Sequence, residues 1–408
     1  MISTGDELVT GRTVDTNSAW LARKLLDRGI ATLSHHTVGD DAEEIASQIR
    51  SAAQRADIVL VTGGLGPTPD DLTRQALAQL LGTELVLHEE SLGRLREFFR
   101  RRGRPMVDAN LIQVMIPQGA SPLDNEIGTA PGIKADLASA IVICMPGVPE
   151  EMRAMFDRVV VDALGPSPAA IAVKVLRVYG MGESSLSEKI NDILSRRDGD
   201  VVVGTTVADG LISLTIRGSG SDESSIRSRV DETAAELSQR LGDLIIGTGS
   251  ATLASAIGEL LTARGETLSL AESCTGGLVG RMITSVSGAS QYFPGGVVSY
   301  ANSAKRDLLG VSQDILDDLG AVSEPVALEM AQGARKRFGS DWAISLTGIA
   351  GPGGGTAEKP VGLVFIGLVG PSTRKVFRHV LASDRSQIRR RAALAALNHL
   401  RLAIIAQE

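Results

Sequence analysis

Residues 271–305 have the sequence AESCTGGLVGRMITSVSGASQYFPGGVVSYANSAK, which predicts a strand end, a glycine turn and the start of a helix. The adjacent glycines Gly276 and Gly277 allow backbone N–H groups to approach an anion at the helix N-terminus, where the helix dipole also favours negative charge. Ser273 and Thr275 add two hydroxyl groups to the same turn. The turn therefore predicts a phosphate-binding site.

The same stretch holds three side chains, Ser290, Tyr300 and Lys305, that form a candidate catalytic group without histidine. Tyr300 ends an apolar run that predicts a strand, and Lys305 falls in the first turn of the next predicted helix. A lysine at the positive end of a helix dipole has a lowered pKa, which makes it a proton acceptor for a hydroxyl nucleophile. Ser273 and Cys274 are rival nucleophiles, although a cysteine is more often a small buried residue.

The composition of the chain restricts both its fold and its partners. A length of 408 residues predicts about two to three domains. The net charge of −7, with acidic and basic residues interspersed, argues against binding to nucleic acid. Cys144 and Cys274 match no metal-binding spacing, so we expect free thiols in a reducing compartment. No apolar run approaches the roughly 20 residues of a membrane span and no signal-peptide pattern is present, so we expect a cytoplasmic protein without membrane contact.

The first block of the chain, residues 1–165, alternates predicted strands and helices. Buried strands are expected at residues 57–62 and 140–145, and both lead into turns that contain glycine and proline. Such alternation predicts a parallel sheet with helices on both faces, with ligands bound beyond the carboxyl ends of the strands. Helices are expected at residues 16–29, 42–55, 70–81 and 90–102.

Two linkers of small residues, 165–171 and 247–251, separate the remaining blocks. Residues 172–247 predict a small α+β layer whose acidic residues outnumber the basic ones, which favours a spacer or dimerisation module over RNA binding. Its strands are expected at 173–179, 201–207, 211–217 and 244–246, and its helices at 183–194 and 223–241. Residues 252–408 predict a second α/β block. Its strands are expected at 268–270, 296–300, 342–347, 361–369 and 375–381, before a C-terminal helix from Ser386 to about Ala406.

Several motifs occur in a fixed order and give the chain a specific resemblance to a known family. They are TGDEL (residues 4–8), TGGLGPT (62–68), DD (70–71), GTAPG (128–132), PGVPEE (146–151), AESCTGG (271–277), GGVVSYANSAK (295–305) and LTGIAGPGG (346–354). Together they resemble the CinA family (competence/damage-inducible protein A). The resemblance covers essentially the whole chain and implies a multidomain α/β protein. The domains that it implies are a molybdopterin-binding-like three-layer α/β domain at 1–165, a small α+β (KH-like) domain at 172–247 and an α/β deamidase domain at 252–408.

For the third block, the resemblance implies an amidohydrolase that converts nicotinamide mononucleotide and water into nicotinate mononucleotide and ammonia, without a cofactor. Carried over by position, Ser290 is the expected nucleophile, with Tyr300 and Lys305 as its activating pair. A homodimer is also expected. The expected substrate-binding residues are Ser273, Thr275, Gly276, Gly277, Thr347, Gly348, Gly351 and Gly353.

For the first block, the resemblance implies ADP-ribose pyrophosphatase activity in some members, with a divalent metal ion such as Mg²⁺, Mn²⁺ or Co²⁺. Only Met1 and Ile2 precede Ser3-Thr4-Gly5, so we expect either a start further upstream or an incomplete first strand. The expected nucleotide-binding residues are Gly63, Gly64, Gly66, Thr129 and Gly147. The expected metal ligands are Asp6, Glu7, Asp70 and Asp71.

Two other classes of function remain open at this point. One is a non-enzymatic protein whose pockets hold nucleotides as sensors, and the other is a molybdenum-cofactor-related binding protein. The presence of Ser290, Tyr300 and Lys305 favours an enzyme over a sensor. Fold analogy alone supports the molybdenum-cofactor role, and fold analogy is a weak guide to function.

Overall fold

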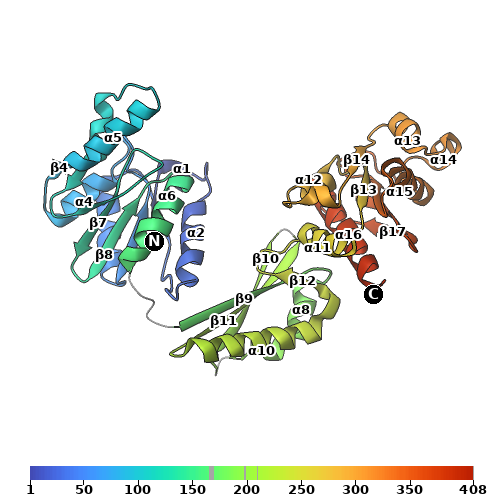
Figure 1. Ribbon diagram of the computed structural model, residues 1–408, viewed down its shortest axis with the longest axis horizontal. Helices are drawn as coiled ribbons and strands as arrows, with labels where there is room; N and C mark the ends of the chain where they lie inside the picture. The colour runs from blue at the N-terminus through green and yellow to red at the C-terminus, as the bar shows by residue number, and fades with distance from the viewer. Residues whose placement is uncertain (165–169, 197–198, 209, 408) are drawn as a thin grey trace. The chain divides into compact units, whose positions relative to one another are not determined.

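A computed structural model describes residues 1–164, 170–196, 199–208 and 210–407, and its contacts divide the chain into two compact units (Figure 1). The first unit is Met1–Ile171 and the second is Ala172–Glu408. Most of the predicted linker at 165–171 lies outside the described residues. The predicted linker at 247–251 falls inside the second unit, so the middle and C-terminal parts share one compact body.

The first unit is built on a six-stranded mixed sheet with the order β2-β1-β3-β8-β7-β6. Its first four strands in this order are parallel, as the alternation predicts, whereas β7 and β6 are antiparallel. The reason is the two-residue connection between β7 and β8, with Ala138 at φ 55°, because so short a turn can only join antiparallel strands. The strands are β1 (Ile2–Thr4), β2 (His36–Val38), β3 (Ile58–Thr62), β6 (Ser121–Leu123), β7 (Gly132–Leu137) and β8 (Ala140–Met145).

The short first strand is nevertheless fully integrated into the sheet. Residues Ile2–Thr4 pair with β2 on one side, and Ile2 and Ser3 pair with β3 on the other. Ile2 is completely buried, and the N-terminal amine donates a hydrogen bond to the Ser34 carbonyl at 2.9 Å. The first strand therefore has only three residues, and it is paired on both sides.

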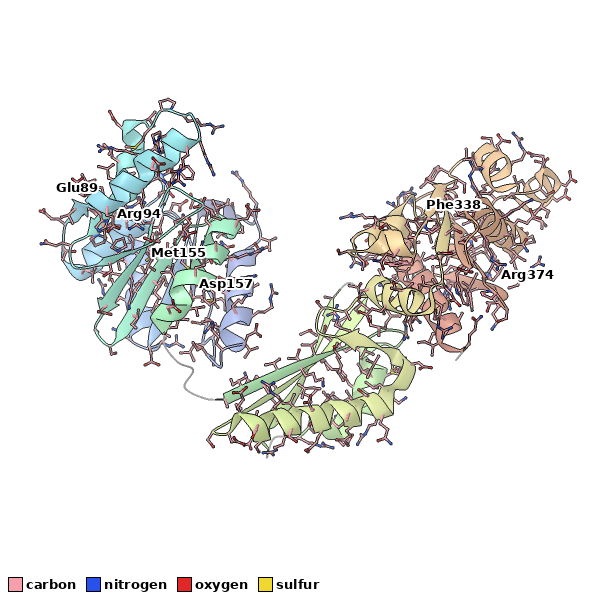
Figure 2. All side chains as sticks on the ribbon, viewed as in Figure 1. Glu89, Arg94, Met155, Asp157, Phe338 and Arg374 are labelled. Carbon is pink, nitrogen blue, oxygen red and sulfur yellow. The ribbon has the colours of Figure 1, made fainter. Side chains whose placement is uncertain are left out.

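Helices cover both faces of this sheet, which gives three layers. Ile45 and Leu77, from α3 and α4, lie in the core on one face. Leu21 and Met155, from α2 and α6, lie in the core on the other, and Met155 is labelled in Figure 2. Helix α5 and η1 add a small peripheral core around Leu95, and β4 and β5 form a two-stranded ribbon. The remaining elements are α1 (Asp6–Val9), α2 (Thr16–Leu26), α3 (Ala42–Ala53), α4 (Thr73–Leu81), β4 (Leu85–Leu87), α5 (Glu89–Arg101), η1 (Asp108–Val114), β5 (Met115–Pro117), α6 (Pro149–Met155), the π-helical η2 (Phe156–Val160) and α7 (Val161–Leu164).

The middle part of the chain is a four-stranded sheet, order β10-β11-β9-β12, packed against helices. Helix α10 matches its predicted range because Asp222 caps its first turn and Gly242 follows its end. The predicted helix 183–194 is divided at Ile190, which is fully buried and has non-helical angles (φ −125°, ψ 19°). The elements are β9 (Ala170–Val178), α8 (Glu183–Lys189), α9 (Asn191–Leu194), β10 (Val201–Ala208), β11 (Leu211–Gly220), α10 (Glu223–Leu241), η3 (Gly242–Leu244) and β12 (Ile245–Thr248).

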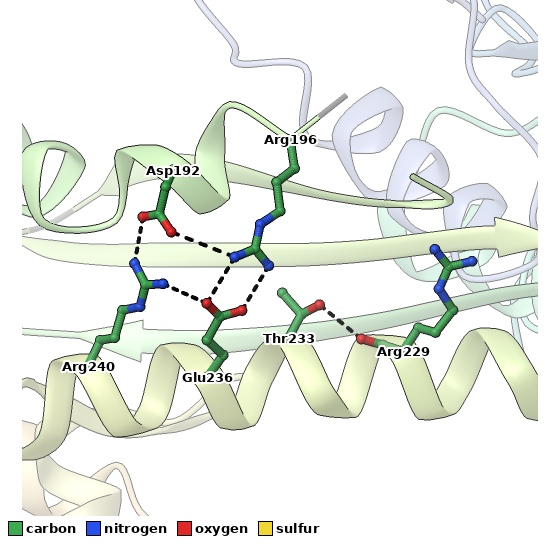
Figure 3. Close-up of polar contacts among 6 residues, drawn as sticks. All are labelled: Asp192, Arg196, Arg229, Thr233, Glu236 and Arg240. Carbon is green, nitrogen blue, oxygen red and sulfur yellow. Dashed lines mark hydrogen bonds and ion pairs between the residues drawn. The ribbon is translucent and has the colours of Figure 1, made fainter. Parts of the chain in front are cut away.

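An ion-pair network joins α9 and the residues after it to α10 (Figure 3). Arg196 donates two hydrogen bonds to Glu236, at 2.8 and 2.9 Å. Arg240 donates to both Glu236 and Asp192, at 2.6 and 2.5 Å. These arginines are occupied by carboxylates, so this face offers no free basic groups from the network to a phosphate backbone.

The C-terminal part is another three-layer structure, built on the five-stranded sheet β14-β13-β15-β16-β17. Strands β14, β13 and β15 are parallel, and β16 and β17 continue the sheet antiparallel. Helices α11, α12 and α16 cover one face, and α13, α14 and α15 cover the other. The elements are α11 (Leu253–Arg264), β13 (Leu268–Glu272), α12 (Leu278–Thr284), η4 (Ala289–Gln291), β14 (Gly295–Val298), α13 (Asn302–Leu309), α14 (Gln313–Leu319), α15 (Glu324–Phe338), β15 (Trp342–Gly348), β16 (Leu363–Val369), β17 (Arg374–Val380) and α16 (Arg385–Ile405).

The middle and C-terminal parts share part of one hydrophobic core. Leu211 and Ile246 are buried in the same cluster as Leu394 of α16. Arg401, only 3% exposed, donates hydrogen bonds to the carbonyls of Asp243 and Ile245. Over the described part of the chain, no helix has the length and apolar character that crossing a membrane requires.

Candidate active site

A cavity of about 220 Å³ lies where β13 and β15 end. This is the edge of a parallel sheet segment at which ligands commonly bind. The lining includes two basic residues and no acidic one. The residues that line the cavity are Ser273, Cys274, Tyr300, Asn302, Lys305, Ala321, Val322, Thr347, Gly348, Ala350 and Arg385.

The centre of the site is a direct contact between Lys305 and Ser273. The Lys305 Nζ lies 3.1 Å from the Ser273 Oγ, and the lysine side chain is only 1% exposed. Lys305 stands in the first turn of α13, and Ser273 directly follows β13. The parallel pairing of β13 with β14 brings the two side chains together across 32 residues of sequence.

The burial of Lys305 makes its amine easier to deprotonate. Burial lowers the pKa of Lys305 below its usual value of 10.5. Its other two partners are backbone carbonyls, Ser299 O at 2.9 Å and Tyr300 O at 3.2 Å. The protonated amine donates one N–H to each of its three partners, Ser299 O, Tyr300 O and Ser273 Oγ. Loss of one proton leaves two N–H groups for the carbonyls and a lone pair for the Ser273 hydroxyl. Lys305 is therefore placed to accept the proton of Ser273.

Cys274, the other rival nucleophile, is not activated by its surroundings. It is buried, with 7% exposure, and burial raises the pKa of its thiol to about 11. A thiol is a nucleophile only as thiolate, so at neutral pH this one is unreactive. The geometry of the cavity favours Ser273 over Cys274.

The helix start after the glycine turn is already occupied by a carboxylate. Gly276 and Gly277 have positive φ values of 59° and 89°, as the predicted turn requires. However, the first free N–H groups of α12, at Val279 and Gly280, donate to Glu272 at 3.1 and 2.8 Å. At the predicted phosphate site, the Glu272 carboxylate therefore already accepts the two N–H groups that a phosphate would need.

Thr275 is buried and does not line the cavity. Its Oγ1 is without a partner among the described residues, and its carbonyl accepts a hydrogen bond from Arg389 at 2.6 Å. Thr347 and Gly348 do line the cavity, and the Thr347 hydroxyl donates to Ala321 O at 2.7 Å. Gly351 and Gly353 lie outside the lining, in the loop after β15.

Tyr300 is brought to Lys305 by its main chain rather than by its hydroxyl group. Its ring is 61% exposed, and its hydroxyl accepts a hydrogen bond from Arg385 at 3.1 Å. Arg385 also donates to Gly351 O at 2.8 Å and lines the cavity. Sequence reasoning missed Arg385, although there was a signal. It is a cation directly before the predicted C-terminal helix, where the dipole disfavours positive charge.

The structure does not bring Ser290 together with Lys305. Ser290 lies in η4, is exposed, and is absent from the cavity lining. Two residues later, the carbonyl of Tyr292 accepts a hydrogen bond from the N–H of Leu268, the first residue of β13. Ser273 follows the last residue of the same strand. Five residues of strand span about 16 Å, so the two serines lie toward opposite ends of β13.

The predicted nucleotide-binding residues of the first unit fall into two places. Gly63 and Gly147 lie together beyond β3 and β8, where a Cβ on Gly147 would meet Gly63 Cα at 3.3 Å. Added Cβ atoms on Gly64 and Gly66 would overlap the side chains of Thr73 and Asp71, so close packing within the protein explains these glycines.

Thr129 stands apart from these glycines. It lines a separate cavity of about 850 Å³ between α5 and residues 124–131, which none of the four glycines lines. Its hydroxyl accepts a hydrogen bond from Gln113 at 2.8 Å.

The predicted metal ligands do not form a metal site among the described residues. No group of three or more His, Cys, Asp or Glu side chains there is arranged to hold an ion. Asp6 and Asp40 each accept the backbone N–H of the other, at 3.0 and 3.1 Å, and Asp71 is bonded to Thr68. Burial and the neighbouring carboxylates raise the pKa of Asp40. These residues do not fit a divalent cation in this arrangement.

Comparisons with known proteins cover the whole chain. Three family models match: a probable molybdopterin binding domain at residues 1–166, the damage-inducible protein CinA KH domain at 173–247, and the CinA C-terminal domain at 250–404. A CinA-like protein of Dictyoglomus turgidum is 40% identical over 409 residues, covering 99% of this chain and 98% of its own. A putative competence-damage inducible protein of Halothermothrix orenii is 41% identical over 391 residues, covering 95% of this chain and 94% of its own.

Among solved structures, the competence/damage inducible protein CihA from Agrobacterium tumefaciens is 43% identical, covering 38% of this chain and 93% of that chain, with a TM-score of 0.36. The relatives share about two residues in five along nearly their full length, and the three family models follow one another in the same order as the three parts of the fold. The chain belongs to the CinA family.

Proposed function

We propose that the C-terminal part of this protein is an amidohydrolase with Ser273 as its nucleophile and Lys305 as its general base. The observation that carries the proposal is the buried Lys305 Nζ, 3.1 Å from the Ser273 Oγ in a cavity open to a small molecule. A hydroxyl and a base within hydrogen-bond distance, with the base fixed by further groups, form the general pattern of an activated nucleophile. Ser290 lies outside this cavity, so the proposal moves the nucleophile from Ser290 to Ser273.

The chemistry balances without a histidine. Neutral Lys305 accepts the proton of Ser273 while the Ser273 Oγ attacks the carboxamide carbon. The C–N bond then breaks, and the ammonium group of Lys305 returns the proton to the departing nitrogen, which leaves as ammonia. Water attacks the resulting ester with Lys305 again as base. This releases the carboxylic acid product and restores Ser273 and the neutral amine.

We infer that the substrate is nicotinamide mononucleotide, as the family resemblance implies. Two features of the cavity support a carboxamide substrate that carries negative charge. Arg385 supplies positive charge, and no carboxylate lines the cavity. Arg385 is held by Gly351 O and the Tyr300 hydroxyl, so its guanidinium is fixed at the cavity wall, where it suits a phosphate. In this proposal Arg385, rather than the start of α12, binds the phosphate.

A substrate series tests this proposal. Purified protein should release ammonia from nicotinamide mononucleotide much faster than from nicotinamide riboside or free nicotinamide. Arg385→Gln should reduce kcat/KM for the mononucleotide by about 10- to 100-fold and affect the riboside little, since loss of a charged hydrogen bond costs about 1.5–3 kcal/mol. Arg378→Gln, on exposed β17, is the charge-matched control. Equal turnover of mononucleotide and riboside by the wild type would overturn the phosphate assignment.

The first unit supports no comparable proposal of hydrolysis. Its glycine turns are explained by internal packing, and its predicted metal ligands do not converge. ADP-ribose cleavage therefore remains what the family resemblance implies for this unit.

A further inference from the structure

Glu272, the last residue of β13, is a buried carboxylate that the proposed chemistry does not use. It is only 2% exposed. Its two oxygens accept the N–H groups of Val279 and Gly280 at the start of α12, at 3.1 and 2.8 Å. Backbone N–H groups and the positive end of the helix dipole thus offset the cost of burying this charge. The carboxylate closes a loop around residues 273–277, the turn that carries the nucleophile.

The main chain of the same residue supports the base. The Glu272 carbonyl accepts the N–H of Ser299 at 2.8 Å. The carbonyl of Ser299 in turn accepts a hydrogen bond from Lys305 Nζ at 2.9 Å. Glu272 is therefore linked through its side chain to the turn that follows Ser273, and through its backbone to Ser299, whose carbonyl orients Lys305.

We propose that Glu272 is a positioning residue that holds the Ser273 Oγ within reach of the Lys305 Nζ by fixing α12 to the end of β13. The proposal rests on the Ser273–Lys305 pair proposed above. The turn between the two anchor points contains two glycines with positive φ, Gly276 and Gly277, and glycine restrains a backbone least. Only the Ser273 N–H, bonded to Leu346 O at 2.9 Å, ties the first residue of the turn directly to the sheet. Without the carboxylate, the turn keeps the hydrogen bond between Thr275 O and Arg389 but loses its anchor to the start of α12.

The test compares Glu272→Gln and Glu272→Ala with the wild type. Glutamine keeps one acceptor oxygen for α12, whereas alanine keeps none, so kcat should fall in the order Glu, Gln, Ala. Misplacement of a reacting group by about 1 Å costs on the order of 100-fold, so we expect a loss of about 10-fold for Gln and about 100-fold for Ala. KM should stay within about twofold, because Glu272 does not line the cavity.

Asp341→Asn provides a matched control. The Asp341 carboxylate accepts the N–H and hydroxyl of Thr267 at 2.8 and 2.9 Å, directly before β13, which is the same kind of anchor at the other end of the same strand. We expect this variant to lower the melting temperature and leave kcat unchanged. A kcat loss equal to that of Glu272→Gln would show that both residues act only through general stability, and would overturn the positioning role.

A second measurement separates failure of this proposal from failure of the proposed function. The rate at which a fluorophosphonate probe labels Ser273 reports nucleophile activation without any assumption about the substrate. Glu272→Gln, shown to be folded by its melting curve, should be labelled about 10-fold more slowly than wild type. If the wild type is labelled at Ser273 but releases no ammonia from nicotinamide mononucleotide, the substrate assignment fails while this test stands. Wild-type labelling and kcat in Glu272→Gln would refute the positioning role.

Discussion

Replacing Lys305 by methionine separates the catalytic role of the amine from its structural role. Methionine is similar in length and apolar, so it fills the same buried volume without the amine. Three hydrogen bonds are lost, to Ser273 Oγ, Ser299 O and Tyr300 O, at 3.1, 2.9 and 3.2 Å. Each buried carbonyl left without a donor costs about 1–3 kcal/mol, but the variant also avoids the cost of burying the amine. We therefore expect a change of only about 1–2 kcal/mol in the free energy of unfolding.

The effect on turnover should be much larger. A positioned general base contributes about 10²- to 10⁴-fold, so kcat for ammonia release should fall by that factor in Lys305→Met. Urea denaturation of the same sample gives the stability change, and Lys336→Met, at an exposed position on α15, is the control. If the folded Lys305→Met protein kept kcat within tenfold of wild type, Lys305 would not be the base.

The pH dependence provides an independent check on the same residue. Activity requires the neutral amine, and burial lowers the pKa of Lys305, so kcat/KM should rise with pH to half its maximum below pH 10.5. Stability should follow the same residue. Between the folded-state pKa and 10.5 the unfolded chain binds the extra proton, so the free energy of unfolding falls as pH decreases through this window. Lys305→Met should lack this fall. A pH-independent kcat/KM would contradict the role of Lys305 as base.

Three further outcomes are expected. Tyr300→Phe should keep kcat for ammonia release within about threefold, because its hydroxyl meets Arg385 rather than Lys305 Nζ; a 100-fold loss would restore Tyr300 as a proton carrier. His379 and His399 lie with their Nε2 atoms 2.9 Å apart, and burial lowers the pKa of His399 to about 4 and that of His379 below 6.5. The free energy of unfolding in urea should therefore fall by about 1–2 kcal/mol, after allowance for solvent screening, as pH decreases from 6.5 to 4, and His399→Gln should reduce this fall. A fragment of residues 250–408 should retain kcat but lose on the order of 2 kcal/mol of stability, because Leu211 and Ile246 leave the core and Arg401 loses its carbonyl acceptors; an inactive folded fragment would indicate a composite site.

Local sequence signals predicted most of the secondary structure. The range expected for α10 is the observed one because both ends carry cap residues, Asp222 and Gly242. The break at Ile190 was not predictable, because it has no glycine or proline and depends on burial of that side chain in the core of the middle part. The antiparallel pairing of β7 with β8 was also missed, since it depends on a two-residue turn with Ala138 in the left-handed region.

The site shows where sequence reasoning reaches its limit. Motif and spacing indicated Lys305 as the base, but three hydroxyl or thiol groups in nearby turns were available as nucleophile. Only the register of β13 and β14 decides which of them meets the amine, and register depends on pairing between distant segments. The predicted strand at 296–300 ends earlier, at Val298, and the carbonyls of Ser299 and Tyr300 accept hydrogen bonds from Lys305 instead.

The most direct test of the central claim compares Ser273→Ala and Ser290→Ala with nicotinamide mononucleotide as substrate. Each folded variant is assayed for ammonia release, and the wild type is quenched during turnover and examined by peptide mass spectrometry for an acyl group on serine. The Ser273–Lys305 contact predicts that Ser273→Ala loses about 100-fold or more in kcat, that Ser290→Ala keeps wild-type kcat, and that the acyl group lies on Ser273. Full activity in Ser273→Ala, with loss of activity in Ser290→Ala or an acyl group on Ser290, would contradict it.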